Sequence, residues 1–196
     1  MAADIRIVEE ARQPMGMHPR KFALWLFMAT VVMMFGAWTS AYIVKRGAPG
    51  WSSFELPTQF WINSLLIVIS SITLALGQRS ARRDELEKAK LMVSLTAVLG
   101  VLFLVGQYLA WGKMVEMNYY FTGTGSNTSG TFIYVLTGVH GVHVVSGVIV
   151  LLVLLFDTFR YKVHSKNMTG MEMCSMYWHF LGGLWLYLFV FLILNR

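Results

Sequence analysis

The chain has 196 residues, of which 56% are hydrophobic and only 13% charged, with a formal net charge of +6. Soluble domains carry about 25% charged residues, so the composition excludes an ordinary soluble domain and a disordered tail. The single cysteine, Cys174, excludes a disulfide framework. An excess of Lys and Arg is typical of membrane proteins, whose basic loops lie beside anionic lipid headgroups, and we expect no nucleic-acid partner.

The N-terminal segment 1–21 contains Asp4, Glu9 and Glu10 and lacks the apolar core of a signal peptide, so we expect it to remain as a cytoplasmic tail. Five uncharged apolar runs follow within residues 22–196, each with at least the ~17 residues that cross a bilayer as a helix. Barrel strands would alternate over about ten residues, and these runs do not. The sequence therefore predicts an all-α, polytopic membrane protein, a bundle of five transmembrane helices. The predicted spans are about 22–44, 60–76, 91–111, 131–156 and 174–194.

Lys and Arg are distributed unevenly between the two sets of loops. Twelve lie in the tail and in the connections between spans two and three and between spans four and five, whereas the other loops and the C-terminus hold four. Basic loops stay inside, so we expect a cytoplasmic N-terminus and a C-terminus on the outer side. All acidic and basic residues and all four prolines fall outside the predicted spans, which argues against a pump or an ion-coupled transporter.

Polar side chains do occur within the predicted spans, and each needs a hydrogen-bond partner there. His140 and His143 share a helical face, which His179 could also meet. A metal or haem site stays open as an alternative, but no carboxylate that could orient imidazole ligands accompanies these histidines, so hydrogen bonds between helices are favoured. We expect no catalytic residue and no metal ligand in this chain. The residues interpreted as structural contacts between helices are His140, His143, His179, Gln107, Asn63 and Trp178.

Three arginines, Arg79, Arg82 and Arg83, lie beside the end of the second span, in a connection of mixed charge. The simplest interpretation is a solvated loop that fixes topology. Guanidinium groups at this depth can also hold anionic lipid headgroups, at about 1 kcal/mol each, and we predict lipid binding by these three side chains. Small residues at four-residue spacing favour either internal helix packing or contact with another subunit, and both stay open: Gly36 with Ser40, Ala37 with Ala41, and Thr137 with Gly141.

The fourth span carries the segment GTFIYVLTGVHGVHVVSG, from Gly130 to Gly147. It closely resembles the pattern of subunit III of the haem-copper terminal oxidases, in which a Gly-Ser/Thr-Phe-Phe run leads to Thr-Gly-Phe-His-Gly-Leu-His-Val and a later glycine. The segments WINSLLIVISSIT, LGVLFLVGQYLAW and YWHFLGGLWLYLF of spans two, three and five are also similar to segments of that family. The likeness runs from about Arg20 to the C-terminus, and the five spans resemble the short bacterial form of the subunit.

The resemblance implies an accessory, non-catalytic subunit of a cytochrome c oxidase, which reduces dioxygen to water and pumps protons during aerobic respiration. Such a subunit lies in the bacterial inner membrane, packs directly against catalytic subunit I beside subunit II and other respiratory subunits, and binds phospholipid. Haem and copper are then carried by the partner subunits. A quinol oxidase subunit III stays open as an alternative, and a subunit associated with nitric oxide reductase or a small transporter is less favoured.

Two positions depart from the family pattern. Val31 stands where the family usually has an intramembrane glutamate in the first of these spans, and Ala110 stands where it usually has a glutamate three residues after the third-span glutamine. Functions of the family that depend on these carboxylates, such as proton handling, are therefore not implied for this chain.

Overall fold

The computed structural model describes residues 18–47, 51, 54–121, 123, 127–160 and 168–195. Over these ranges the chain forms helices and no strand, which confirms the predicted all-α class. Within the described residues, five helices are long and apolar enough to cross a membrane. The predicted tail lies outside the described residues except for 18–21. The helices are α1 (Pro19–Arg46), α2 (Gln59–Arg82), α3 (Leu86–Glu116), α4 (Thr128–Phe159) and α5 (Thr169–Leu194).

Each helix extends beyond the predicted span at one or both ends. Charged residues mark the edge of the apolar run, but they can complete further helical turns outside the hydrocarbon. At the start of α1, Pro19 takes the first helical position and the His18 Nδ1 accepts a hydrogen bond from the Arg20 backbone N–H at 3.3 Å. Between α2 and α3 the chain reverses through Asp84, whose φ of 56° is in the left-handed region.

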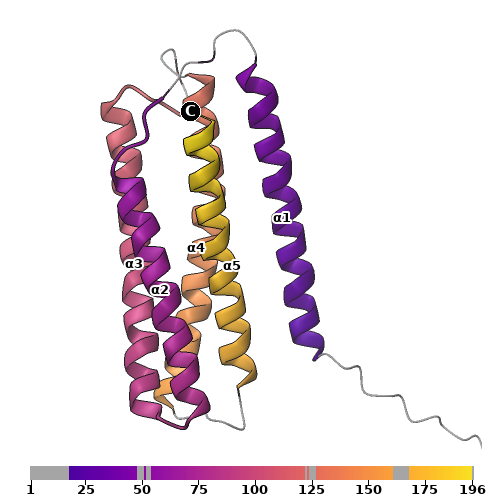
Figure 1. Cartoon of the computed structure of the whole chain (residues 1–196), viewed down its shortest axis with the longest axis vertical. Coiled ribbons are helices and arrows are strands. Elements are labelled where there is room, and N and C mark those ends of the chain that lie inside the picture. The colour runs from indigo at the N-terminus through magenta and orange to yellow at the C-terminus, as the bar shows by residue number, and fades with distance from the viewer. Residues whose placement is uncertain are drawn as a thin grey trace, which may run out of the picture.

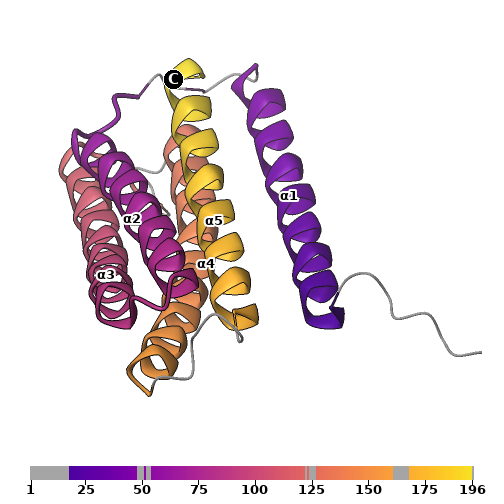
Figure 2. The ribbon, with the colours of Figure 1, turned by 60° about the horizontal axis from the view of Figure 1, so that its bottom comes forward.

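Four of the helices form a bundle in which α2 packs on α3, α3 on α4, α4 on α5, and α5 on α2 (Figures 1 and 2). The first helix, α1, stands at one side of this bundle and contacts only α4 and α5. It begins at the end of the bundle where α2 ends, α4 ends and α5 begins. We call this the basic end, because Lys21, Arg79, Arg82 and Arg160 lie there.

Large apolar side chains face outward on all five helices, as a bilayer requires. The interior contains most of the polar side chains that the spans hold, including Asn63, Ser70 and Gln107. Lipid chains are as apolar as leucine, so burial of apolar surface does not hold such helices together. Close packing and interhelical hydrogen bonds must do so, and they define the interior described below.

Candidate functional site

Two tryptophans of α5 hold the centre of the bundle. The Trp178 indole N–H donates to Ser70 Oγ at 3.1 Å, and the Trp185 indole N–H donates to Ser64 Oγ at 3.0 Å. Both indoles are fully buried, and both serines belong to α2. These pairs tie α5 to α2 at two levels, so Trp178 contributes a hydrogen bond as well as packing.

Glycines of α3 and α4 make room for the Trp178 ring. A Cβ added at Gly100 would lie 2.6 Å from Trp178 Cη2, and a Cβ at Gly147 would lie 3.4 Å from Trp178 Cε3 and 2.6 Å from Leu181 Cδ1. The sequence pattern did not identify Gly100 as a packing position. Gly147 could have been identified, since it is the later glycine of the family pattern.

Polar pairs also join α2 to α3. The Asn63 side-chain amide donates to Gln107 Oε1 at 3.3 Å, and the hydroxyl groups of Thr73 and Thr96 lie 2.8 Å apart. Asn63 packs so closely against Gly106 that a Cβ there would collide with the amide oxygen. The structure therefore brings together two of the predicted contact residues, Asn63 and Gln107.

His140 is fully buried, and the described residues do not include a partner for the interhelical hydrogen bond expected from the sequence. Neither ring nitrogen has a hydrogen-bond partner among the described residues. The ring instead packs against Phe35 of α1, Phe103 of α3 and Trp185 of α5, with centroid distances of 6.4, 6.1 and 5.3 Å. Within the described residues, aromatic rings therefore surround the imidazole, and the expected hydrogen bond between helices stays a prediction.

His143 and His179 have different environments. The His143 Nδ1 lies 2.8 Å from the Val139 carbonyl oxygen of its own helix, so this contact does not join helices as expected, while its ring packs on Phe27 and Phe35 of α1. His179 is exposed on α5 and does not join the other two histidines. Within the described ranges, no three His, Cys, Asp or Glu side chains gather where they could hold a metal ion.

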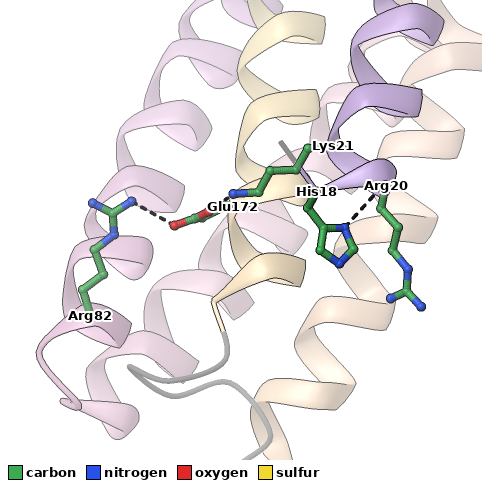
Figure 3. A network of polar contacts seen from close by, with 5 residues as sticks. All are labelled: His18, Arg20, Lys21, Arg82 and Glu172. Carbon is green, nitrogen blue, oxygen red and sulfur yellow. Dashed lines mark hydrogen bonds and ion pairs between the residues drawn. The ribbon is translucent and has the colours of Figure 1, made fainter. Parts of the chain in front are cut away.

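An ion-pair network at the basic end connects three helices (Figure 3). Glu172, in the first turn of α5, pairs with Lys21 of α1, and its other oxygen accepts from the Arg82 guanidinium of α2 at 3.3 Å. Figure 3 shows the carboxylate between the two basic side chains. This contact was not predictable from the sequence pattern, because Lys21 and Glu172 are 151 residues apart.

Replacing Glu172 by glutamine is expected to loosen the start of α1. The Lys21 and Glu172 side chains are about 29% and 28% exposed, so the network is worth about 1 kcal/mol. Hydrogen exchange of the first α1 turns should accelerate by about fivefold. Glu85→Gln is the matched control, since Glu85 pairs only locally with Lys88 at 2.8 Å. Equal exchange rates in the two variants would contradict a role for Glu172 in holding α1.

The three arginines predicted to bind lipid differ in their surroundings. Arg79 and Arg82 line a hollow of about 390 Å³ on the surface of α2, whose other walls are Ile72, Ala75, Leu76 and Gln78. Arg83 caps the end of α2, is exposed, and does not line this hollow. The hollow thus combines two guanidinium groups with an apolar floor.

The positions that lack the family carboxylates are both inside the molecule. Val31 is 2% exposed and lies one turn from Phe27 and one turn from Phe35, on the α1 face that packs on His143. Ala110 of α3 is fully buried. Both side chains pack as ordinary apolar residues.

The small-residue pairs divide into two groups. Thr137 of α4 is buried and accepts a hydrogen bond from the Trp111 indole N–H at 3.0 Å, so its face packs internally. On α1, in contrast, Gly36, Ala37, Ser40 and Ala41 are all exposed, and a Cβ added at Gly36 would meet nothing within 4 Å. This α1 face, the small-residue face, has no partner within the described part of the chain.

Comparison with known proteins identifies the family. Residues 17–195 match the family described as cytochrome c oxidase subunit III. The chain is 31% identical over 190 residues to cytochrome c oxidase subunit 3 of Thermostichus vulcanus, covering 91% of this chain and 90% of that one. It is 29% identical over 181 residues to the same subunit of Synechocystis sp., covering 88% of this chain and 75% of that one. It is also 29% identical over 176 residues to the cytochrome bo(3) ubiquinol oxidase subunit 3 of Pseudomonas aeruginosa, covering 86% of this chain and 81% of that one. The chain therefore belongs to the cytochrome c oxidase subunit III family of the haem-copper oxidases.

Proposed function

We propose that this chain is the accessory, non-catalytic subunit III of an aerobic respiratory cytochrome c oxidase, in which the assembled complex reduces dioxygen to water and pumps protons. The match to the family over residues 17–195 carries this proposal, since it covers nearly the whole chain. Haem and copper are held by partner subunits in this account. The relative from a ubiquinol oxidase supports the alternative of a quinol-oxidising complex, which would use the same subunit architecture.

The small-residue face of α1 supports direct packing against another membrane subunit, for which catalytic subunit I is the expected partner. Small residues let two helix backbones approach closely, and this packing is a main source of helix association in lipid. Gly36, Ala37 and Ser40 have no such use where they face acyl chains. The same face would bring α1, the least enclosed helix of this chain, into the interior of the complex.

The hollow beside Arg79 and Arg82 supports phospholipid binding. A headgroup phosphate can accept hydrogen bonds from the guanidinium groups, while an acyl chain lies along Ile72 and Leu76. Arg82 is already paired with Glu172, so Arg79 is the side chain with more freedom to bind a phosphate.

Arg79→Gln is expected to remove about one tightly held phospholipid per chain, because it removes a charge worth about 1 kcal/mol at the headgroup. The measurement is the phospholipid content of the purified complex, by mass spectrometry after a fixed detergent wash. Arg83→Gln removes the same charge from the same end of α2, outside the hollow, and should leave the content unchanged. An unchanged content in the Arg79 variant would count against lipid binding in the hollow.

The excess of basic residues at one end supports an inner-membrane protein with a cytoplasmic N-terminus and a periplasmic C-terminus. Cysteine labelling in intact cells tests this orientation. A cysteine placed at Asn195 should react with an impermeant maleimide, and one placed at Arg83 should not.

Deleting the gene for this chain tests the accessory role. The oxidase that remains should keep its haem spectrum and its initial rate of oxygen uptake, while losing activity faster during turnover and during detergent extraction. Complete loss of oxygen uptake by an oxidase with an intact haem spectrum would mean that this chain takes part in the chemistry, and the proposal would fail.

A further inference from the structure

Arg82 takes part in two sites at the basic end of the bundle. Its side chain lines the hollow on α2 together with Arg79, and its guanidinium group also pairs with Glu172 of α5. Glu172 in turn pairs with Lys21 of α1 through its other carboxylate oxygen. Arg82 and Glu172 therefore connect the proposed lipid site to the contact that holds the start of α1 (Figure 3).

The two basic partners of Glu172 hold it unequally. Lys21 is the closer partner, and the side chains of that pair are both less than a third exposed. The Arg82 Nη2 group lies 3.3 Å from the carboxylate, beyond the about 2.7–2.9 Å of a strong charge-assisted hydrogen bond, and the Arg82 side chain is 59% exposed. Exposed ion pairs are weak because water and salt screen them. Arg82 is therefore the partner that can leave Glu172 at small cost.

A phosphate in the hollow would compete with Glu172 for the Arg82 guanidinium. A guanidinium binds most strongly when two of its N–H groups donate to two oxygens of a phosphate or carboxylate, and Glu172 receives only the one long bond. The wall residue Gln78 is held more firmly, because its Oε1 accepts a hydrogen bond at 2.9 Å from Ser175, a buried residue of α5. Arg82 is thus a movable part of the hollow beside a fixed one.

We propose that Glu172 couples the binding of an anionic phospholipid in this hollow to the packing of α1 on α5. While Lys21 lies on Glu172, it neutralises the carboxylate and leaves Arg82 available for the headgroup phosphate. When the start of α1 moves away, Glu172 turns to Arg82 and competes with the lipid. The inference rests on the lipid binding proposed above. It adds that the lipid and the α1 contact strengthen each other, since coupling between two sites is reciprocal.

The charges at this site favour an anionic lipid. The hollow and the ion-pair network together hold three cationic side chains and one carboxylate, which are Lys21, Arg79, Arg82 and Glu172. Their excess of positive charge attracts a headgroup with a net negative charge more strongly than a zwitterionic one. Ile72 and Leu76 in the wall of the hollow fit an acyl chain, so the expected ligand is a phospholipid and not free phosphate.

The test is a titration of the full chain, purified in a mild detergent and stripped of lipid, with phosphatidylglycerol. Native mass spectrometry gives the dissociation constant. Glu172→Gln removes the competitor of the phosphate and should tighten binding by about threefold. Lys21→Gln leaves Glu172 to Arg82 alone and should weaken binding by about threefold, although Lys21 does not line the hollow. Arg20→Gln is the matched control, because it removes the same charge from the same turn of α1 and the Arg20 side chain points away from Glu172 (Figure 3). It should leave binding unchanged.

The double variant separates competition from direct attraction. If Lys21 acts through Glu172, adding Lys21→Gln to Glu172→Gln should leave the dissociation constant unchanged. Equal weakening with and without Glu172 would mean that Lys21 attracts the lipid directly, and it would overturn the coupling. Weaker binding by the Glu172 single variant would mean that the carboxylate orients Arg82 toward the phosphate, and it would also overturn the proposal.

Arg79→Gln separates failure of the coupling from failure of the lipid site itself. Weaker binding by this variant, together with unchanged binding by the Glu172 variant, would support the lipid site and overturn the coupling alone. Equal binding by the Arg79 variant and the unmodified chain would overturn both proposals. Glycerol 3-phosphate at the same concentration should not displace the lipid, and displacement would overturn the choice of a phospholipid over a soluble phosphate.

The reciprocal effect can be measured on α1 in the unmodified chain. Phosphatidylglycerol should slow the hydrogen exchange of the first α1 turns by about threefold, because it draws Arg82 from Glu172 and leaves the carboxylate to Lys21. Saturating lipid should have no such effect on Arg82→Gln. Equal slowing in both chains would contradict coupling through Arg82.

Discussion

Trp178→Ala is expected to lower the melting temperature of this subunit by about 6–12 °C, because it removes about 3 kcal/mol of packing from the bundle centre. The Trp178 side chain is 1% exposed, contacts glycines of α3 and α4, and donates to Ser70 of α2. Since lipid solvates apolar groups well, the cost comes mainly from the cavity and the lost hydrogen bond. Thermal unfolding of the full chain in detergent measures it.

The matched control for this prediction is Trp25→Ala. Trp25 of α1 is 53% exposed, so its removal leaves no internal cavity and should shift the melting temperature by less than a third as much. In the complex, the Trp178 variant should also dissociate from its partner subunits at a lower detergent concentration. Equal shifts for the two tryptophans would show that Trp178 does not hold the helices together.

Gly100→Ala should destabilise the bundle by about 1–3 kcal/mol, even though alanine is the better helix former. The added methyl group would lie 2.6 Å from the rigid end of the Trp178 ring, which is itself confined by Gly147 on the other side. The ring cannot move away from the added methyl group without straining its hydrogen bond to Ser70 of α2. Differential scanning fluorimetry of the detergent-solubilised chain is a suitable measurement.

Gly112→Ala on the same helix provides the comparison for Gly100. It lies at an exposed site where an added Cβ meets nothing within 4 Å, so we expect no loss and a gain of up to about 1 kcal/mol. The two substitutions are chemically identical and differ only in what the methyl group meets. If both variants were stabilised, the close packing of Trp178 against Gly100 would be contradicted.

The helices were predictable because their signal is local. Uncharged runs longer than the bilayer is thick have one stable backbone conformation in lipid, so the five spans could be placed without knowledge of their partners. The helix ends were less predictable, because residues such as Glu87 and Asp157 continue a helix beyond the hydrocarbon while marking the end of an apolar run.

Contacts between helices depend on distant residues, and the sequence indicated them only in part. Polar residues inside spans were expected to find partners, and Asn63 with Gln107 is one such pair. His140 shows the limit of that reasoning, since the aromatic rings that surround it come from three other helices. The pairing of Lys21 with Glu172 joins the two ends of the chain and follows only from the packing of α1 on α5.

The optical spectrum of whatever co-purifies with this chain tests the central claim most directly. The chain, tagged at its C-terminus, is isolated from native membranes in a mild detergent, and a reduced-minus-oxidised difference spectrum is recorded together with a copper determination. The account predicts haem bands and copper, both contributed by partner subunits of an oxidase. A stable, colourless chain that purifies alone from membranes containing an active oxidase would contradict it.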